Sequence, residues 1–319
     1  MIKIAAVGCG GIQNEHYRHL SAIHDVKLVG HCDIDRARAE DAANQYGGDA
    51  FIDYEAMYDK VKPHAVYISV PPFAHSGMEE AAAARSIHLF IEKPIGWDCT
   101  AAKRIGAAIK RADIITSVGY CWRYYDTVAK AREVLRGKAV SLIRGAWNGD
   151  MPGVWWWRRM DKSGGQVNEQ TTHIFDLARY LCGDVAEVYA AGATGCQTHV
   201  ENYTVHDSSV VTLRMKSGAA GVITSSCVAS HHGDVGLEIV TPEATVSIRF
   251  GKLTVHEDGT VTEYSPKVNI YGEEDRAFIE AVRTGKRTKI KSSFADAQKT
   301  FAVTCAANES MRSGLPVKP

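Results

Sequence analysis

Apolar residues in the first third of the chain occur in short runs that end in turns. The segments between these runs carry alanine and charged residues at helical spacing. The runs predict buried parallel strands, and the intervening segments predict crossover helices. The predicted strands are residues 2–7, 26–31, 50–51, 65–70, 87–91 and 114–119. This alternation predicts an α/β fold with a doubly wound parallel sheet of the Rossmann type.

The pattern changes after residue 139, where apolar and polar positions alternate with a period of two. Glycine, aspartate and serine separate these stretches, as they do in antiparallel sheets. The predicted strands are residues 139–147, 203–213, 221–226, 237–240, 244–250 and 252–255, with a further strand beginning near 188. The second half is therefore expected to be an α+β domain with a large, mostly antiparallel sheet. One face of such a sheet is available for a second subunit.

The change of pattern predicts two domains. We expect a dinucleotide-binding domain over residues 1–122 and a substrate-binding and oligomerisation domain over 123–319. Residues 273–284 and 294–312 are predicted to close the chain as helices, the second of which packs back on the first domain. A homodimer or homotetramer is expected.

Composition excludes several classes of function. Lysine plus arginine equals aspartate plus glutamate at 37 each, so no broad basic field favours nucleic acid or an anionic membrane. The 8 cysteines form no C-x-x-C pair, which argues against a zinc ribbon, a redox dithiol or a disulfide framework. No run has the pattern of a signal peptide or a membrane span. A soluble protein of the reducing cytoplasm is expected.

The first apolar run stops at closely spaced glycines, and a helical segment follows. Gly8 permits a tight turn, and Gly10 removes a side chain that would separate phosphates from helix amides. The expected phosphate contacts are Gly8, Gly10, Gly11, Ile12 and Gln13. Gln13 stands where the G-x-G-x-x-G pattern has its third glycine, which affects packing more than phosphate binding. The alternative is a glycine turn with no ligand, common in α/β proteins.

Acidic residues follow the second predicted strand. Asp33 lies where an adenosine ribose would present its hydroxyls, and Asp35 suits the N-cap of the next helix. A carboxylate at Asp33 would repel a 2′-phosphate, which favours NAD over NADP. Arg36 is the nearby cation that would make NADP possible.

Two further strand ends carry polar groups at the same sheet edge. The third long strand runs into Val70, Pro71, Pro72 and, three residues later, His75. The fourth ends in Glu92-Lys93-Pro94, where the proline limits the backbone around a lysine. These residues are expected to line the cofactor site, with Lys93 pointing into the cleft.

With Gly119 and Arg123, these motifs resemble the Gfo/Idh/MocA family of NAD(P)-dependent oxidoreductases. The resemblance runs nearly from end to end of the chain. It implies that Trp122 and Arg123 lie beside the nicotinamide; a hydrophobic hinge with a solvated arginine is the alternative.

The second domain contains a helical stretch at residues 165–183 with an apolar stripe, and Glu169, His173 and Asp176 fall on a neighbouring face. The family shows Asp-x-Gly-x-His-x-x-Asp here, and this chain has Glu169 and Thr171 at the first two positions. The resemblance implies that Lys93 and His173 hold the reacting hydroxyl, that Glu169 tunes His173, and that Asp176 binds another hydroxyl or braces the loop. A metal site and a purely structural ion pair are the alternatives; no metal is expected.

Three consecutive tryptophans, residues 155–157, precede Arg158. An indole face stacks well on the C–H face of a sugar ring, so Trp157 and Arg158 are expected to contact substrate. Subunit packing is an equally good use of these tryptophans.

Together, these features predict an oxidoreductase that transfers a hydride between NAD, with NADP possible, and a secondary hydroxyl or ketone of a sugar, cyclitol or related polyol. The alternatives are an NAD-dependent glycosidase of the same fold and a nucleotide-binding regulator without catalysis. Either Lys93 or His173 fits the role of general base.

Overall fold

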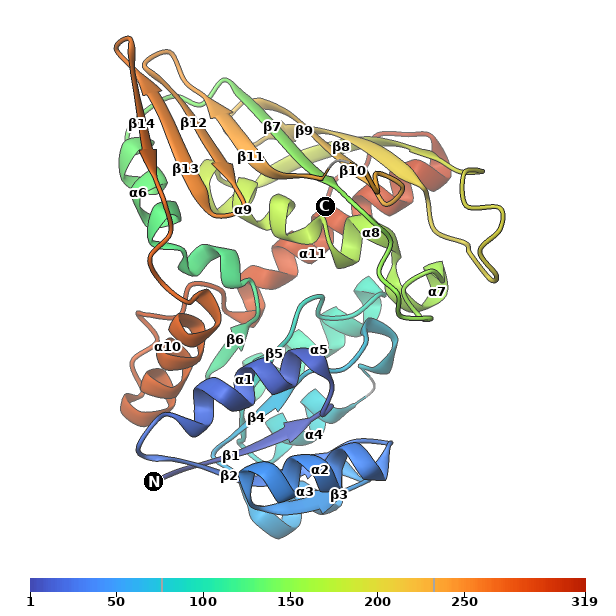
Figure 1. Cartoon of the computed structure of the whole chain (residues 1–319), viewed down its shortest axis with the longest axis vertical. Coiled ribbons are helices and arrows are strands. Elements are labelled where there is room, and N and C mark those ends of the chain that lie inside the picture. Colours follow the sequence, from blue (N-terminus) through green and yellow to red (C-terminus); the bar gives the residue numbers. More distant parts are fainter. Residues whose placement is uncertain (76, 232) are drawn as a thin grey trace. The chain divides into compact units, whose positions relative to one another are not determined.

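The computed structural model describes residues 1–75, 77–231 and 233–319 (Figure 1). It divides the chain into two compact units. Unit 1 contains residues 1–96, 100–121 and 269–298, and unit 2 contains residues 97–99, 122–268 and 299–319. The main boundary falls at residues 121/122, next to the expected one. The sequence assigned residues 269–298 to the second domain, whereas these residues are part of unit 1.

Unit 1 is built on a parallel sheet of six strands in the order β3-β2-β1-β4-β5-β6. This order is the one that binds dinucleotides at the carboxyl edge of the sheet. Its strands are β1 (Ile2–Val7), β2 (Val26–Cys32), β3 (Asp49–Phe51), β4 (Ala65–Ile68), β5 (His88–Ile91) and β6 (Thr116–Val118). Its helices are α1 (Gly11–Ser21), α2 (Arg36–Tyr46), α3 (Tyr54–Val61), η1 (Pro72–Ala74), α4 (Met78–Ala84), α5 (Cys99–Ala112, whose first residue belongs to unit 2) and α10 (Ile270–Thr284).

Helix α10 joins unit 1 because its apolar face completes the core of that unit. Phe278 and Ile279 are buried beside Tyr67 and Phe90 of the sheet, and α10 packs against α1. The rings of Tyr67 and Phe90 stack with centroids 4.5 Å apart. Helical spacing predicted this helix, but nothing local in the sequence tells which sheet it covers.

Unit 2 contains a sheet of eight strands in the order β14-β13-β12-β11-β7-β10-β9-β8. All neighbours are antiparallel except β7 and β10, which are parallel. The strands are β7 (Leu142–Asn148), β8 (Val185–Ala193), β9 (Ser208–Met215), β10 (Ala220–Ser226), β11 (Asp234–Val240), β12 (Ala244–Arg249), β13 (Lys252–Glu257) and β14 (Thr260–Tyr264). The predicted fold class is confirmed.

The helices of unit 2 include α9, which covers one face of this sheet at β7 and β11. Gly145 of β7 permits the close approach, because a Cβ there would lie 2.6 Å from Cγ2 of Ile174 in α9. These helices are η2 (Cys121–Tyr124, whose first residue belongs to unit 1), α6 (Asp126–Val134), α7 (Met160–Ser163), α8 (Gly165–Glu169), α9 (Thr172–Cys182) and α11 (Phe294–Ser313), which begins in unit 1. Among the described residues, no helix has the length and apolarity needed to cross a bilayer.

A disulfide bond joins Cys99 and Cys305 within unit 2. The expectation that the cysteines form no disulfide is therefore wrong for this pair. The two residues are 206 positions apart in the chain. Local spacing carries no signal for a pair brought together only by the fold.

Candidate active site

The glycine turn after β1 has the form of a phosphate cradle. Gly8 has a φ of +87°, and a Cβ there would lie 2.4 Å from the carbonyl oxygen of Ser69. At Gly10 and Gly11 a Cβ would meet no described atom within 4 Å, so the space before α1 is open. Gly10 caps α1 without a side chain, which leaves the positive end of the helix available to an anion. These residues fit the pyrophosphate of a dinucleotide.

Gln13 occupies the position of the third glycine and is fully buried. The Ser69 hydroxyl donates to its Oε1 at 2.7 Å, which joins the first turn of α1 to the end of β4. Its Nε2 has no hydrogen-bond partner among residues 1–75, 77–231 and 233–319. The larger side chain therefore fills the packing space of the glycine and adds a donor. The preceding residue, Ile12, is half-buried.

Asp33 is held rigidly at the carboxyl end of β2. Its Oδ2 accepts from the backbone N–H of Cys9 at 2.8 Å, and its Oδ1 accepts from that of Asp35 at 2.9 Å. Each oxygen retains a further lone pair, the capacity that a pair of ribose hydroxyls requires. Burial raises the pKa of the Cys9 thiol to about 11, so the turn gains no thiolate that would repel phosphate.

Asp35 and Arg36 lie on the surface at the start of α2. The Asp35 carboxylate caps the helix by accepting from the N–H of Ala37, which confirms the prediction for this residue. Arg36 is exposed and lies 3.6 Å from the Glu40 carboxylate.

The segment after β4 turns at Pro71 and Pro72, next to the half-buried Val70, and leads to a buried His75. Nδ1 of His75 lies 2.5 Å from Oε1 of Glu79, which is in the first turn of α4. Nε2 of His75 has no hydrogen-bond partner within the described chain. Glu79 thus fixes the orientation of the imidazole and leaves its second nitrogen for a ligand or water.

Glu92 anchors the segment that carries Lys93. The N–H of Glu92 donates to the carbonyl oxygen of Ile68 at 2.8 Å, which extends the sheet beyond β5. Its Oε2 accepts from the N–H of Lys93 at 3.0 Å, and the peptide between Lys93 and Pro94 is cis. Gly119 lies against this carboxylate, because a Cβ there would stand 2.5 Å from Oε1 of Glu92. The lysine backbone is therefore fixed at the carboxyl edge of the sheet.

In unit 2, His173 lies in the first turn of α9 against two indole rings. Its ring stacks on Trp122 with centroids 6.1 Å apart and on Trp147 with centroids 5.7 Å apart. The imidazole makes interplanar angles of 23° and 20° with the two indoles, whose own centroids lie 6.0 Å apart at an angle of 37°. The three rings form one aromatic cluster, and its contacts restrict the orientation of the imidazole. Sequence reasoning missed Trp147, whose only signal is its place at the end of a predicted strand.

Glu169 is bound to the tryptophan cluster. The indole Nε1 of Trp157 donates to Oε2 of Glu169 at 2.9 Å. Trp157 is 0% exposed and packs against Val205 and Cys227. Within unit 2 the Trp157 side chain has no exposed surface that a substrate could contact. Trp155, in contrast, is 56% exposed. The expected contact of Trp157 with substrate therefore competes with its place in the core of unit 2.

The expected face of Glu169, His173 and Asp176 is interrupted by a break in the helix. Helix α8 ends at Glu169, and α9 begins at Thr172. The hydroxyl of Thr171, which replaces the family's glycine, lies 2.8 Å from that of Ser225. The break therefore puts Glu169 and His173 on separate helices.

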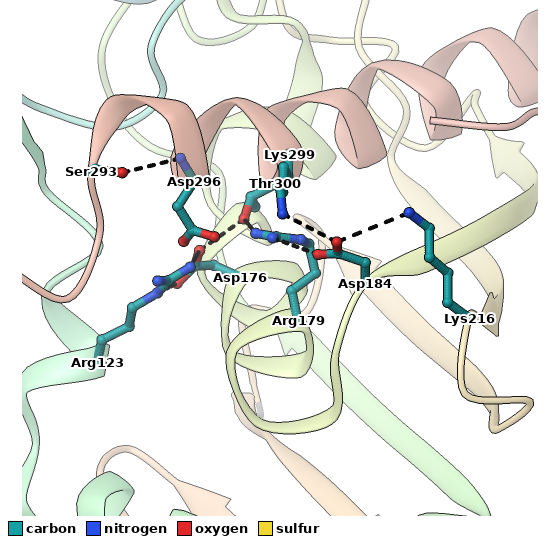
Figure 2. Close-up of polar contacts among 9 residues, drawn as sticks. All are labelled: Arg123, Asp176, Arg179, Asp184, Lys216, Ser293, Asp296, Lys299 and Thr300. Carbon is teal, nitrogen blue, oxygen red and sulfur yellow. Dashed lines mark hydrogen bonds and ion pairs between the residues drawn. The ribbon is translucent and has the colours of Figure 1, made fainter.

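Asp176 and Arg123 form a buried ion pair with two hydrogen bonds (Figure 2). The Thr300 hydroxyl also donates to Oδ1 of Asp176 at 2.8 Å. The guanidinium of Arg123 lies over the ring of Tyr180, 4.7 Å from its centroid. The expected contacts of Arg123 with cofactor and of Asp176 with substrate thus compete with strong internal partners. Arg158 is half-buried, and its carbonyl oxygen accepts from the N–H of Thr204.

Comparison with known proteins agrees with this arrangement. Residues 2–120 match the family model described as "Oxidoreductase family, NAD-binding Rossmann fold", and residues 129–247 match the "GFO/IDH/MocA C-terminal domain". The chain belongs to the Gfo/Idh/MocA family. Unit 1 is accordingly an NAD-binding Rossmann domain, and the protein is an oxidoreductase.

Several relatives of this Gfo/Idh/MocA protein have assigned activities. The scyllo-inositol 2-dehydrogenase (NAD(+)) of Bacillus subtilis is 26% identical, over 99% of this chain and 96% of the relative. The myo-inositol 2-dehydrogenase of Thermotoga maritima is 28% identical, over 75% of this chain and 72% of the relative. Among solved structures, a probable dehydrogenase from Thermotoga maritima superposes with a TM-score of 0.83 at 25% identity, covering 99% of this chain and 98% of that one.

Proposed function

We propose that this protein is a dehydrogenase that oxidises a secondary hydroxyl of a cyclitol, sugar or related polyol with NAD. The observation that carries the proposal is the anchored Glu92-Lys93-Pro94 segment at the carboxyl edge of the NAD-binding sheet. The backbone of the lysine at this edge is fixed by Glu92 and Gly119. The inositol dehydrogenases among the relatives support the substrate class.

In the proposed chemistry, the alcohol loses a hydride from its carbon and a proton from its hydroxyl group. NAD, when bound, accepts the hydride from that carbon. Lys93 and His173 hold the hydroxyl, and one of them takes its proton as the carbonyl forms. The two neighbouring indoles restrict the orientation of the His173 ring, and the Glu92 carboxylate holds the Lys93 backbone.

Asp33 supports NAD as the preferred cofactor. Its two oxygens are fixed by backbone amides and retain acceptor capacity for the ribose hydroxyls. A 2′-phosphate at the same place would bring two negative charges together. Arg36 is exposed and close to Glu40, so its positive charge is partly offset.

We also infer a homo-oligomer formed through the sheet of unit 2. Exposed apolar side chains on this sheet include Tyr189 of β8, Val210 of β9 and Val261 of β14. Burying such side chains against a second copy is favourable. Light scattering at micromolar concentration tests this proposal, and a monomer of 34.8 kDa would contradict it.

The experiment that tests the function is a screen of inositols, sugars and sugar alcohols for NADH formation. A hit is expected among cyclitols or pyranoses with NAD, and the variant Lys93→Ala serves as the control for a contaminating activity. Release of a glycosidic leaving group without net NADH formation would instead indicate a glycosidase. If no polyol is oxidised while NADH binds, the proposed dehydrogenase activity is wrong.

A further inference from the structure

Four titratable side chains are buried together in unit 1, next to the Lys93 segment. They are His16 of α1, Glu92 after β5, and Glu274 and Asp275 of α10. His16, Glu274 and Asp275 are 0% exposed and Glu92 is 5% exposed. Burying this many ionisable groups without a function is costly, because each charge loses its hydration. None of the roles assigned above uses His16, Glu274 or Asp275.

The hydrogen bonds define the charge of His16. Its Nδ1 lies 2.8 Å from Oδ1 of Asp275, and its Nε2 lies 3.0 Å from Oε1 of Glu92. An ionised carboxylate only accepts hydrogen bonds, so both ring nitrogens must donate and the ring is an imidazolium. Burial alone opposes this charge, but the carboxylates of Asp275 and Glu92 raise the pKa of His16 well above its ordinary value.

Glu274 is in the opposite situation. Neither of its carboxyl oxygens has a hydrogen-bond partner among the described residues. A carboxylate without donors is strongly disfavoured in a buried site, whereas a neutral acid is tolerated. Burial, and then the charge of Glu92, raise the pKa of Glu274 well above its ordinary value. Glu274 is therefore a neutral acid at neutral pH.

Three described side chains beside the cluster, those of Tyr67, Cys121 and Tyr271, are neutral. The Tyr67 hydroxyl donates to Oδ1 of Asp275 at 3.0 Å. Burial raises the pKa of the Cys121 thiol well above its ordinary value, and the neighbouring Cys121 and burial raise that of Tyr271. The cluster thus contains two carboxylates and one imidazolium, and the backbone N–H of Lys93 donates to one of the carboxylates, that of Glu92.

A divalent metal is the other ligand that this cluster suggests, since donor atoms of His16, Glu92 and Glu274 lie within 4.8 Å of one another. A metal on His16, however, requires a ring nitrogen without a proton. Both nitrogens lie at hydrogen-bond distance from carboxylates, and Oε2 of Glu92 accepts from the Lys93 amide. The geometry favours a proton in place of a metal ion.

We propose that His16, Asp275 and Glu274 form a positioning network that controls the charge around Lys93. The inference rests on Lys93, rather than His173, acting as the general base of the proposed dehydrogenase. The imidazolium of His16 offsets the charge of Glu92, so that Glu92 holds the Lys93 backbone without strongly stabilising the Lys93 ammonium. Glu274 stores a proton, which keeps a third negative charge out of the cluster. The neutral amine of Lys93 then forms at lower pH.

The charge of Glu274 is tested without any substrate. Infrared spectra at neutral pH should show the C=O stretch of a buried protonated carboxyl group, and this band should disappear in Glu274→Gln. The matched control is Glu273→Gln, which changes the adjacent, exposed glutamate paired with Arg276 and should keep the band. A spectrum without the band, or a metal ion found in the purified protein at one equivalent, would overturn the inference.

The link to Lys93 is tested with the pH profile of kcat for the polyol found in the screen. His16→Gln removes one positive charge from the cluster, so Lys93 should stay protonated to higher pH. The acidic limb should move up by about one pH unit, with NADH affinity within about threefold of wild type. The control is His19→Gln, on the same helix and paired with Glu15.

A merely structural role of His16 lowers kcat equally at every pH. An acidic limb that does not move would overturn the proposed control of Lys93. If no polyol is oxidised, the proposed function fails. The infrared test of Glu274 protonation needs no substrate and still tests the network.

Discussion

Arg123 and Asp176 lock two segments of unit 2 together through a buried, bidentate ion pair. Nε of Arg123 donates to Oδ2 of Asp176 at 2.7 Å, and NH2 of Arg123 donates to Oδ1 at 2.6 Å. The Thr300 hydroxyl, which donates to Asp176, also accepts from Arg179 at 2.7 Å (Figure 2). The pair therefore lies at one end of a continuous polar network of buried side chains.

Asp176→Asn should destabilise the protein severely, because it leaves the Arg123 guanidinium buried without its counter-charge. The expected loss in free energy of unfolding is about 3–5 kcal/mol, measured by urea denaturation. Asp161→Asn is the control, since it breaks an exposed pair with Arg159 and should change little. A stable Asp176→Asn variant with a raised KM for the polyol would instead assign Asp176 to substrate binding.

Asp33→Asn should weaken cofactor binding and reduce the preference for NAD. The substitution keeps the shape but removes the charge that strengthens hydrogen bonds to the ribose, a loss of roughly 10- to 100-fold in affinity for NADH. The ratio of NADPH to NADH affinity should rise in fluorescence titrations. Asp35→Asn is the matched control two residues away, because Asp35 caps α2 and should leave NADH affinity unchanged. Equal turnover of wild type with NADP and NAD would contradict the role of Asp33.

The disulfide between Cys99 and Cys305 should stabilise unit 2 by closing a long loop. Breaking it is expected to cost about 3–5 kcal/mol in the entropic account of cross-links. A reductant should therefore lower the Tm of wild type but not that of Cys305→Ser. Cys182→Ser, which changes a half-buried free cysteine, should respond to reductant as wild type does. Identical thiol counts for wild type with and without reductant would show that the bond does not form in solution.

Features encoded by local pattern could be predicted from the sequence, and features encoded by contacts across the chain could not. The glycine turn at Gly8, the Asp35 cap and the strand before Glu92 each follow from a short stretch and its physical needs. The assignment of α10 to unit 1 depends on a core shared with residues far away in the chain, such as Tyr67 and Phe90. The buried His16 hydrogen-bonds to Asp275, which is 259 residues distant in the sequence.

The proposed substrate site was harder to predict for the same reason. Spacing alone placed Glu169 one helical turn before His173. The helix is interrupted between α8 and α9, however, and the Glu169 carboxylate accepts a hydrogen bond from the Trp157 indole. The aromatic cluster of His173, Trp122 and Trp147 joins three separate elements. No periodicity reports a contact of this kind.

The proposed catalytic pair makes a prediction about turnover. Lys93→Ala and His173→Ala should each lower kcat by roughly two to four orders of magnitude, the usual contribution of a positioned acid or base. NADH affinity should remain close to that of wild type, because the glycine turn and Asp33 are untouched. Glu169→Gln should be milder, since its amide oxygen can still accept from the Trp157 indole.

The pH dependence then distinguishes the base from its partner. A base must be deprotonated to act, so its loss removes the acidic limb of the kcat profile, whereas loss of a group that only orients the hydroxyl lowers kcat and keeps the limb. If Lys93 is the base, Lys93→Met loses the limb and His173→Asn keeps it; the reverse pattern assigns the base to His173. Near-normal oxidation of the polyol by both variants would show that neither side chain acts on the hydroxyl, even with the fold and cofactor as described.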